Sequence, residues 1–140
     1  MLPLAGYGAT GAKWLAKGFK ISETTAVLVK SIGKVSENSK EIVMKTFSNT
    51  FGDAKKVVDE ILDLGDNSKN YVSSMQGGPF SGKVTGKQSA DVKKYWRLDF
   101  DANGQAHINW VNGKKKGRVD FGGGERQVRS IIDNVINKSK

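Results

Sequence analysis

The sequence has no cysteine, a single histidine and only two prolines among its 140 residues. Without cysteine, disulfides, thiolate metal sites and cysteine nucleophiles are excluded. With His107 as the only histidine, a zinc site built from several histidines is excluded as well. No apolar run approaches the ~18 residues that a membrane-spanning helix needs, so we expect no stable insertion into a membrane.

Positive charge is the property that the sequence has in excess. Lysine and arginine number 23 against 14 aspartates and glutamates, a net charge of +9 at pH 7. Residues 1–70 carry a net +2, whereas residues 71–140 carry a net +7 and all four arginines. Arginine presents a planar fork of donors that suits phosphate groups. The basic half therefore favours a nucleic-acid partner, with an acidic protein partner or a purely solubilising charge as alternatives.

The first half of the chain predicts helices followed by a linker. Apolar residues at helical spacing predict three helices, over residues 22–35, over residues 39–47, and from Asp53 to a stop at Gly65. Residues 66–91 are rich in glycine, serine, asparagine and lysine, which is typical of a loop. We therefore expect a helical entry and packing region over 1–70 and a glycine-rich linker over 71–93.

The last part of the chain, residues 94–140, predicts a basic antiparallel sheet closed by a helix. Apolar and polar residues alternate in three short segments, which favours strands. Asn103-Gly104 and Asn112-Gly113 are typical hairpin turns between them. Apolar residues after Gly124 return to helical spacing. The whole chain is thus predicted to be α+β, with N-terminal helices, a small antiparallel β-sheet and a C-terminal helix.

The register of the hairpins follows if apolar residues lie opposite apolar residues. A three-residue loop at residues 102–104 gives the pairs Leu98 with Ile108, Trp96 with Trp110, Asp99 with His107, and Arg97 with Asn109. In the second hairpin, a two-residue turn at Asn112-Gly113 places His107 opposite Arg118. A four-residue loop would shift these partners but keep their face. Either register gives one apolar face, with both tryptophans in the core, and one polar face.

The polar face contains the groups that metal-independent cleavage of RNA requires. RNA supplies its own nucleophile, the 2′-hydroxyl, so the protein must supply a base and cations that stabilise the charged phosphorane. Histidine changes its charge near neutral pH, which makes His107 the candidate general acid or base. Asp99 could orient its imidazole, and Arg97 and Arg118 could hold the phosphate. The candidate RNA-binding residues are Lys114, Lys115, Lys116, Arg126 and Arg129. No cofactor or metal is expected for this reaction.

Other interpretations of the same residues stay open. A non-catalytic RNA- or DNA-binding module could use the same basic face. A magnesium-dependent DNase would use Asp99, Asp101 and Asp120 as metal ligands. A lone histidine on the outer face of a sheet is often an ordinary polar surface residue, and a run of lysines is often a solvated loop.

Residues 95–110, Tyr-Trp-Arg-Leu-Asp-Phe-Asp-Ala-Asn-Gly-Gln-Ala-His-Ile-Asn-Trp, resemble a pattern in the C-terminal toxin regions of bacterial polymorphic toxins. These regions form the tips of contact-dependent growth inhibition effectors and related secreted systems. The shared pattern is an aromatic-Arg-hydrophobic-Asp strand, a glycine turn and a His-hydrophobic-Asn strand. The resemblance covers about a third of the chain, roughly residues 94–140. No second histidine is present, which departs from a two-histidine mechanism.

This resemblance implies a ribonuclease (a hydrolase-type toxin) that often acts on transfer RNA, with a sheet of the barnase, EndoU, colicin or RelE kind. By the motif match, Arg97, Asp99, His107 and Asn109 become active-site candidates. It also implies a cognate immunity protein, and some relatives recruit elongation factor Tu. Such a toxin would be secreted or delivered from the cell surface as part of a larger effector, and would act in the target-cell cytoplasm.

Overall fold

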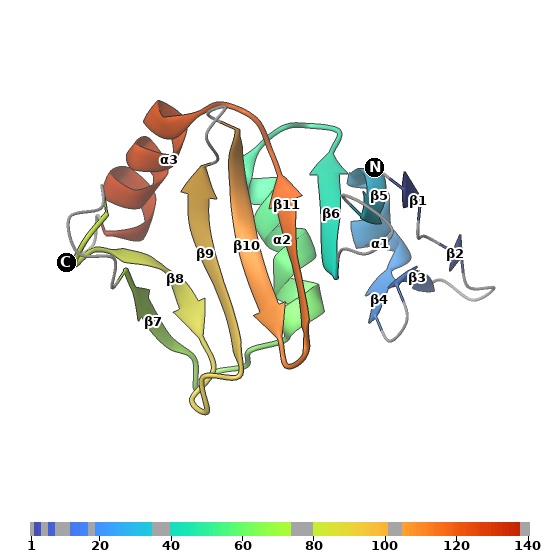
Figure 1. The fold of residues 1–140 in the computed structure, drawn as a ribbon, viewed down its shortest axis with the longest axis horizontal. Helices are drawn as coiled ribbons and strands as arrows, with labels where there is room; N and C mark the ends of the chain where they lie inside the picture. The colour runs from blue at the N-terminus through green and yellow to red at the C-terminus, as the bar shows by residue number, and fades with distance from the viewer. Residues whose placement is uncertain are drawn as a thin grey trace.

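The computed structural model describes residues 2–3, 6–7, 12–16, 19–34, 40–73, 80–100 and 105–137. These residues form a long twisted sheet with helices packed on one face and a smaller sheet at one end (Figure 1). The predicted turn at residues 102–104, Asp101 and the glycine pair Gly77-Gly78 lie outside the described residues. The α+β class and the C-terminal helix that the sequence predicts are confirmed.

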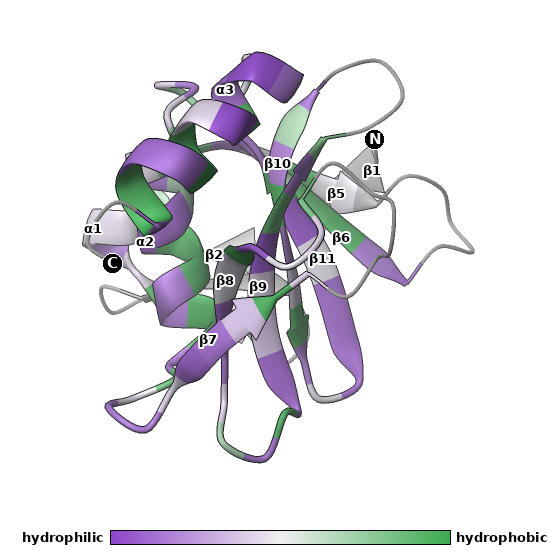
Figure 2. Ribbon diagram, turned by 90° about the vertical axis from the view of Figure 1, so that its left-hand side faces the viewer, coloured by the Kyte–Doolittle hydropathy of each residue, from purple (hydrophilic) through white to green (hydrophobic). Residues whose placement is uncertain are grey.

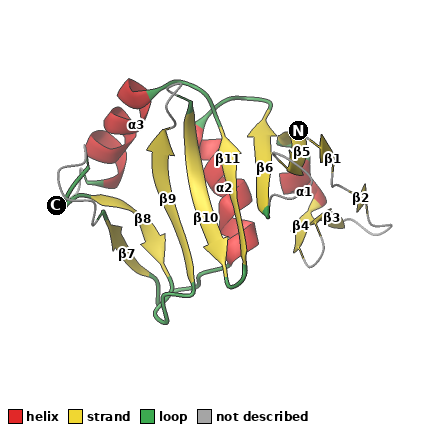
Figure 3. Cartoon of the chain, in the orientation of Figure 1, coloured by secondary structure: helices red, strands yellow, loops and turns green. Residues whose placement is uncertain are grey.

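The main sheet has eight strands in the order β1-β5-β6-β11-β10-β9-β8-β7 (Figure 3). In that order, their bounds are Leu2–Pro3, Val29–Lys34, Glu41–Thr46, Lys115–Asp120, Ala106–Asn112, Lys94–Phe100, Val84–Gln88 and Lys69–Val72. Within the described strands, β6 and β11 run parallel and every other neighbouring pair runs antiparallel. The sheet is therefore mixed, which corrects the prediction of a purely antiparallel one.

A smaller sheet and a short helix lie beside the β5–β6 end. The strands β2 (Gly6–Tyr7), β3 (Ala12–Ala16) and β4 (Phe19–Ser22) form the sheet, and α1 (Glu23–Ala26) follows directly. Ser22 caps α1, because its hydroxyl accepts a hydrogen bond from the Thr25 backbone N–H.

Glu60 on helix α2 joins this small unit to the rest of the fold. Its carboxylate accepts hydrogen bonds from the Ser22 backbone N–H at 2.8 Å, the Ser22 hydroxyl at 2.7 Å and the Thr25 hydroxyl at 2.8 Å. Burial raises the pKa of Glu60, but the hydrogen bonds from Ser22 and Thr25 outweigh burial and hold that pKa below its ordinary value. The contact is thus strongest when Glu60 is ionised.

Two helices cover one face of the main sheet, as Figure 2 shows. Helix α2 (Phe51–Leu62) lies behind β10 and β11, and α3 (Glu125–Ile131) lies over β9 and continues into a π-helical segment, Ile132–Ile136. The residues between helices and sheet are fully buried; they include Val57, Val58, Leu98, Ile108, Trp110, Val119 and Val128. We call the sheet face away from α2 and α3 the open face.

The sequence predicts α2 well because its signals are local. Thr50 caps the helix by accepting a hydrogen bond from the Asp53 backbone N–H. Apolar residues recur at helical spacing along its buried face, and the chain leaves the helix through Asp63, which has a φ of 45°. The third predicted helix is therefore confirmed, although it begins two residues earlier than expected and ends at Leu62, with Asp63 and not Gly65 as its stop.

The predictions of the other two N-terminal helices are wrong. Where described, residues 22–35 form the end of β4, the single turn α1 and the whole of β5, and residues 41–46 form β6. The run Ile42-Val43-Met44 is buried on both faces of the sheet, and such a continuous apolar run fits a buried strand as well as a helix. The segment is a strand because it pairs with β5 and β11, and the periodicity of the sequence contains no information about this pairing.

The segment expected as a loop also contains strands. β7 and β8 lie within residues 66–91 and pair antiparallel with each other, and β8 continues the sheet beside β9. The sheet takes β6 from the expected helical region, β8 from the expected linker and β9–β11 from the expected nuclease region. Strand pairing at the sheet edge thus overrides a composition that is typical of loops.

Candidate functional site

The central strands β9, β10 and β11 lie side by side and carry the polar residues of the open face (Figure 1). Successive side chains of a strand point to opposite faces. On β10, Ile108 and Trp110 point into the core, where both are fully buried. His107 and Asn109 therefore belong to the open face.

His107 lies in the middle of this polar group. Its direct neighbours across the sheet are Asp99 on β9 and Asp120 on β11. Its Nδ1 atom lies 3.1 Å from the backbone carbonyl oxygen of Gln105, and the residue is only 5% exposed. An Nδ1–H group that donates to this carbonyl leaves Nε2 as the ring nitrogen able to accept a proton.

Two arginine–aspartate pairs flank His107, one on each side. Arg97 Nη1 lies 2.6 Å from Asp99 Oδ2, and Arg118 Nε lies 3.2 Å from Asp120 Oδ1. The first pair is about one-third exposed at both side chains, 34% and 35%. In the second pair Arg118 is 26% exposed and Asp120 only 4%. The Arg97 side of the site is therefore the more accessible one, and the Arg118 side is the more structural.

Asn109 occupies the next position along β10, between the two arginines. Its register partners are Arg97 on β9 and Arg118 on β11. Its side-chain amide donates a hydrogen bond to Asp99 Oδ2 at 3.4 Å. The other carboxylate oxygen of Asp99 accepts a hydrogen bond from the Phe100 backbone N–H at 2.8 Å. Asp99 is thus held by three donors, which fixes the carboxylate beside His107.

The predicted register of the first hairpin is confirmed. Asp99 lies opposite His107 and Arg97 opposite Asn109, with Leu98 and Trp96 paired to apolar partners. The turn of the second hairpin is wrong by one residue, because Asn112 pairs with Lys115 and the turn falls on Gly113 and Lys114. Gly113 has a φ of 62°, which a two-residue hairpin turn requires and glycine adopts without strain.

The one-residue shift changes the neighbour of the histidine. Asp120, and not Arg118, lies opposite His107, although every side chain keeps its predicted face. His107 lies on the predicted polar face, but it is buried there, with only 5% of its surface exposed. Its side chain is thus available to a substrate only over a small part of its surface.

The lysines 114–116 lie at the far end of the β10–β11 hairpin from His107. Lys114 is in the turn and exposed, Lys115 is half-buried, and Lys116 is exposed on the open face. Lys116 is four residues from Asp120 on β11, about 13 Å along the strand at 3.4 Å per residue. A strand of nucleic acid would have to run along β11 to contact Lys116 and the histidine together.

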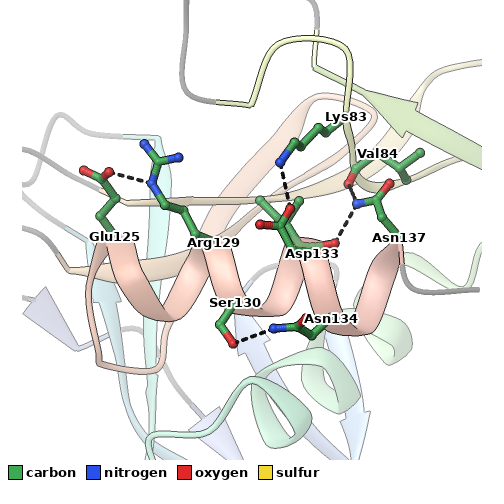
Figure 4. Close-up of polar contacts among 9 residues, drawn as sticks. Lys83, Val84, Glu125, Arg129, Ser130, Asp133, Asn134 and Asn137 are labelled. Atoms are coloured by element: carbon green, nitrogen blue, oxygen red, sulfur yellow. Dashed lines mark hydrogen bonds and ion pairs between the residues drawn. The ribbon is translucent and has the colours of Figure 1, made fainter.

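Arg126 and Arg129 lie on α3, on the helix-covered side of the sheet. Arg129 Nε donates to Glu125 at 2.7 Å (Figure 4), and its guanidinium lies 5.6 Å from the centre of the Phe80 ring. Lys83 and Asp133 pair nearby at 2.7 Å. The structure therefore does not bring these two arginines together with the open-face group.

Sequence reasoning missed the part that β6, β7 and β8 add to the open face. Lys45 on β6 lies opposite Asp120, and Val43 lies opposite Arg118. Tyr71 on β7 stacks on Tyr95 of β9, with ring centres 5.1 Å apart and planes at 26°. The signal that could have indicated β6 is an alternation with a period of two over residues 41–46. Three consecutive apolar residues in this segment obscure that alternation.

Within the described ranges, no three histidine or acidic side chains come together in a way that could hold a metal ion. Asp101, one of the three ligands of the magnesium hypothesis, lies outside those ranges. No helix in the described part of the chain is long and apolar enough to cross a membrane.

Comparison with protein-family models and with curated proteins finds no match for this chain.

Proposed function

We propose that this chain is a metal-independent endoribonuclease whose active site is the open face around His107. One observation carries the proposal: the only histidine of the chain lies between two aspartates, with an arginine beside each of them. A proton-transfer group flanked by phosphate-binding cations is the combination that cleavage of RNA by its own 2′-hydroxyl needs.

In the proposed reaction, His107 Nε2 takes the proton of a 2′-hydroxyl. The 2′-oxygen attacks the adjacent phosphorus, the bond from phosphorus to the 5′-oxygen breaks, and that oxygen takes up a proton from water. His107 then returns its proton to the solvent. The products are a 2′,3′-cyclic phosphate and a free 5′-hydroxyl end. Asp99 and Asp120 both lie opposite His107, where a carboxylate favours the imidazolium that forms.

Arg97 is the arginine that we assign to the phosphate. Its guanidinium has five N–H groups, and Asp99 is paired with Nη1. The pair is about one-third exposed, and such ion pairs contribute at most ~1 kcal/mol, so a phosphate can compete for the arginine. Arg118 instead compensates the charge of the buried Asp120.

The resemblance of residues 95–110 to polymorphic toxin tips extends this proposal. It supplies transfer RNA as the substrate, a cognate immunity protein and elongation factor Tu as partners, and the target-cell cytoplasm as the place of action. It also supplies delivery as part of a larger effector and a fold of the barnase, EndoU, colicin or RelE kind.

A non-catalytic nucleic-acid-binding module is the second candidate. The observation that favours it is the burial of His107, which is 5% exposed, together with the pairing of Arg97 and Arg118 to aspartates. A purely structural histidine held among ion pairs would look the same. In that case the basic open face would bind RNA without cutting it.

The test is incubation of the purified protein with total RNA and, separately, with plasmid DNA, each with and without EDTA. RNA cleavage that survives EDTA and leaves 2′,3′-cyclic phosphate ends supports the ribonuclease. Binding of RNA without cleavage supports the binding module. Plasmid cleavage that EDTA abolishes would favour the magnesium-dependent DNase and contradict the proposal. Arg97→Met is the matched variant, expected to weaken substrate binding with the fold retained.

A further inference from the structure

A stacked pair of tyrosines lies on the open face beyond the arginines. Tyr71 comes from the edge strand β7 and Tyr95 from β9, and their rings are 5.1 Å apart at 26°. β8 runs between these two strands. Its residue opposite Tyr71 is Gly86, so no side chain of β8 separates the rings there. Both tyrosines are half-buried, so part of each ring reaches solvent.

Each of these tyrosines has a cation two residues along its own strand, on the same face. Lys69 precedes Tyr71 on β7 and is exposed, and Arg97 follows Tyr95 on β9. Tyr95 belongs to a row of paired residues that runs across the sheet from β6 to β7. In this row Lys116 on β11 lies on one side of Tyr95 and Lys69 on β7 lies on the other, and Glu41 on β6 follows Lys116. An aromatic surface bordered by cations matches a nucleic-acid strand, whose bases stack while its phosphates bind positive charge.

Tyr95 lies as far along the sheet from the proposed catalytic group as Lys116 does. Tyr95 is four residues from Asp99 on β9, about 13 Å along the strand. Asp99 is the direct neighbour of His107. A strand with a phosphate at Arg97 would therefore place a neighbouring base over the tyrosines.

We propose that Tyr71 and Tyr95 form a stacking subsite for an unpaired base of single-stranded RNA bound along the open face. The choice of RNA rests on the proposed function; the stacking itself rests on the geometry of the pair. The subsite selects single-stranded over paired RNA, because a paired base has no free face to offer. Any base can stack on an aromatic residue, so the subsite selects single-stranded RNA without selecting its base sequence.

The experiment measures binding of a short, fluorescently labelled 2′-O-methyl oligouridine, which lacks the free 2′-hydroxyl and is not cleaved by the proposed reaction. A matched probe has the same backbone with abasic positions. Tyr71→Leu and Tyr95→Leu remove the aromatic surface, and Tyr71→Phe keeps it. Val72→Ala is the control, because Val72 is an exposed residue directly beside Tyr71 on the same edge strand and has no aromatic ring.

We expect both leucine variants to bind the oligouridine about 5- to 150-fold more weakly, the range that loss of one stacked base predicts. The phenylalanine and control variants should bind like the wild type, and no variant should change binding of the abasic probe. Equal binding of oligouridine by the wild type and the leucine variants at unchanged melting temperature would overturn the subsite, as would equal loss on both probes.

The same outcomes separate the subsite from the ribonuclease. If the wild type does not cleave RNA but the tyrosine dependence holds, the subsite stands and the catalytic proposal falls. If RNA is cleaved and the leucine variants bind normally, the catalytic proposal stands and the subsite falls.

Discussion

The substitution Gly117→Ala tests the packing that holds the polar strands together. Gly117 lies on β11, opposite Trp110 on β10 and Ile42 on β6. A Cβ atom there would meet the Ile42 carbonyl oxygen at 2.5 Å and the Trp110 ring at 2.5 Å. The tryptophan is fully buried against this glycine, so neither neighbour has free space to move into.

The magnitude follows from this overlap. Extra atoms in a well-packed core cost about 1–3 kcal/mol. The upper part of that range applies here, because one of the two neighbours is a backbone oxygen that cannot rotate away. For a chain of this size each kcal/mol lowers the melting temperature by roughly 3–4 °C. We therefore expect Gly117→Ala to melt about 6–12 °C below the wild type.

Gly52→Ala is the matched control for this substitution. Gly52 lies in α2, and a Cβ atom built there has no neighbour within 4 Å. Alanine is the better helix former by up to about 1 kcal/mol, so this variant should melt at or above the wild-type temperature. Thermal unfolding followed by circular dichroism measures both. A Gly117→Ala protein as stable as the wild type would refute the packing of Trp110 on β11.

Three further predictions concern charge. Glu60→Gln should destabilise the protein at neutral pH. Because folding lowers the pKa of Glu60, its contribution to stability is present above the unfolded-state pKa and is lost as the pH falls through the folded-state pKa. The difference in urea unfolding free energy between the wild type and Glu60→Gln should therefore shrink in acid. A difference that does not depend on pH would contradict the contact. Arg118→Met should cost more in urea unfolding free energy than Arg97→Met, because it removes a cation from beside the buried Asp120 carboxylate, whereas the Arg97 pair is about one-third exposed and contributes at most ~1 kcal/mol; equal costs would refute the assignment of structural and accessible pairs. RNA binding that neutralises about five phosphates should show a log affinity against log salt slope of roughly −3.5, and a flat dependence would rule out the nucleic-acid partner.

Local patterns in the sequence predict the register of one hairpin of the candidate site, the pairing of β9 with β10. The alternation around Trp96 and Trp110 determines which residues of β9 and β10 face each other, because a shift by one residue would place one of the two tryptophans on the polar face. Asp99, His107, Arg97 and Asn109 are therefore grouped correctly from the sequence alone. The neighbour of His107 on β11 depends on the exact turn, and there the asparagine-glycine signal is one residue off.

Features that depend on distant strands could not be predicted in this way. The place of β6 beside β11 is a parallel pairing across more than sixty residues of chain, and nothing local in Ile42-Val43-Met44 reports it. The stacking of Tyr71 on Tyr95 likewise requires β7 and β8 to add to the sheet in a glycine-rich segment. The burial of His107 depends on packing in three dimensions, so the sequence pattern predicts the face on which it lies but not its exposure.

The most direct test of the central claim is the rate at which His107→Asn cleaves RNA in the presence of EDTA. Asparagine keeps a polar side chain of similar size between Asp99 and Asp120, and the melting temperature of the variant shows whether the fold is retained. Loss of a general acid or base costs typically 10²–10⁴-fold in rate. The account predicts a loss of this size, with formation of 2′,3′-cyclic phosphate ends reduced to the same extent. Cleavage by His107→Asn at the wild-type rate would contradict it.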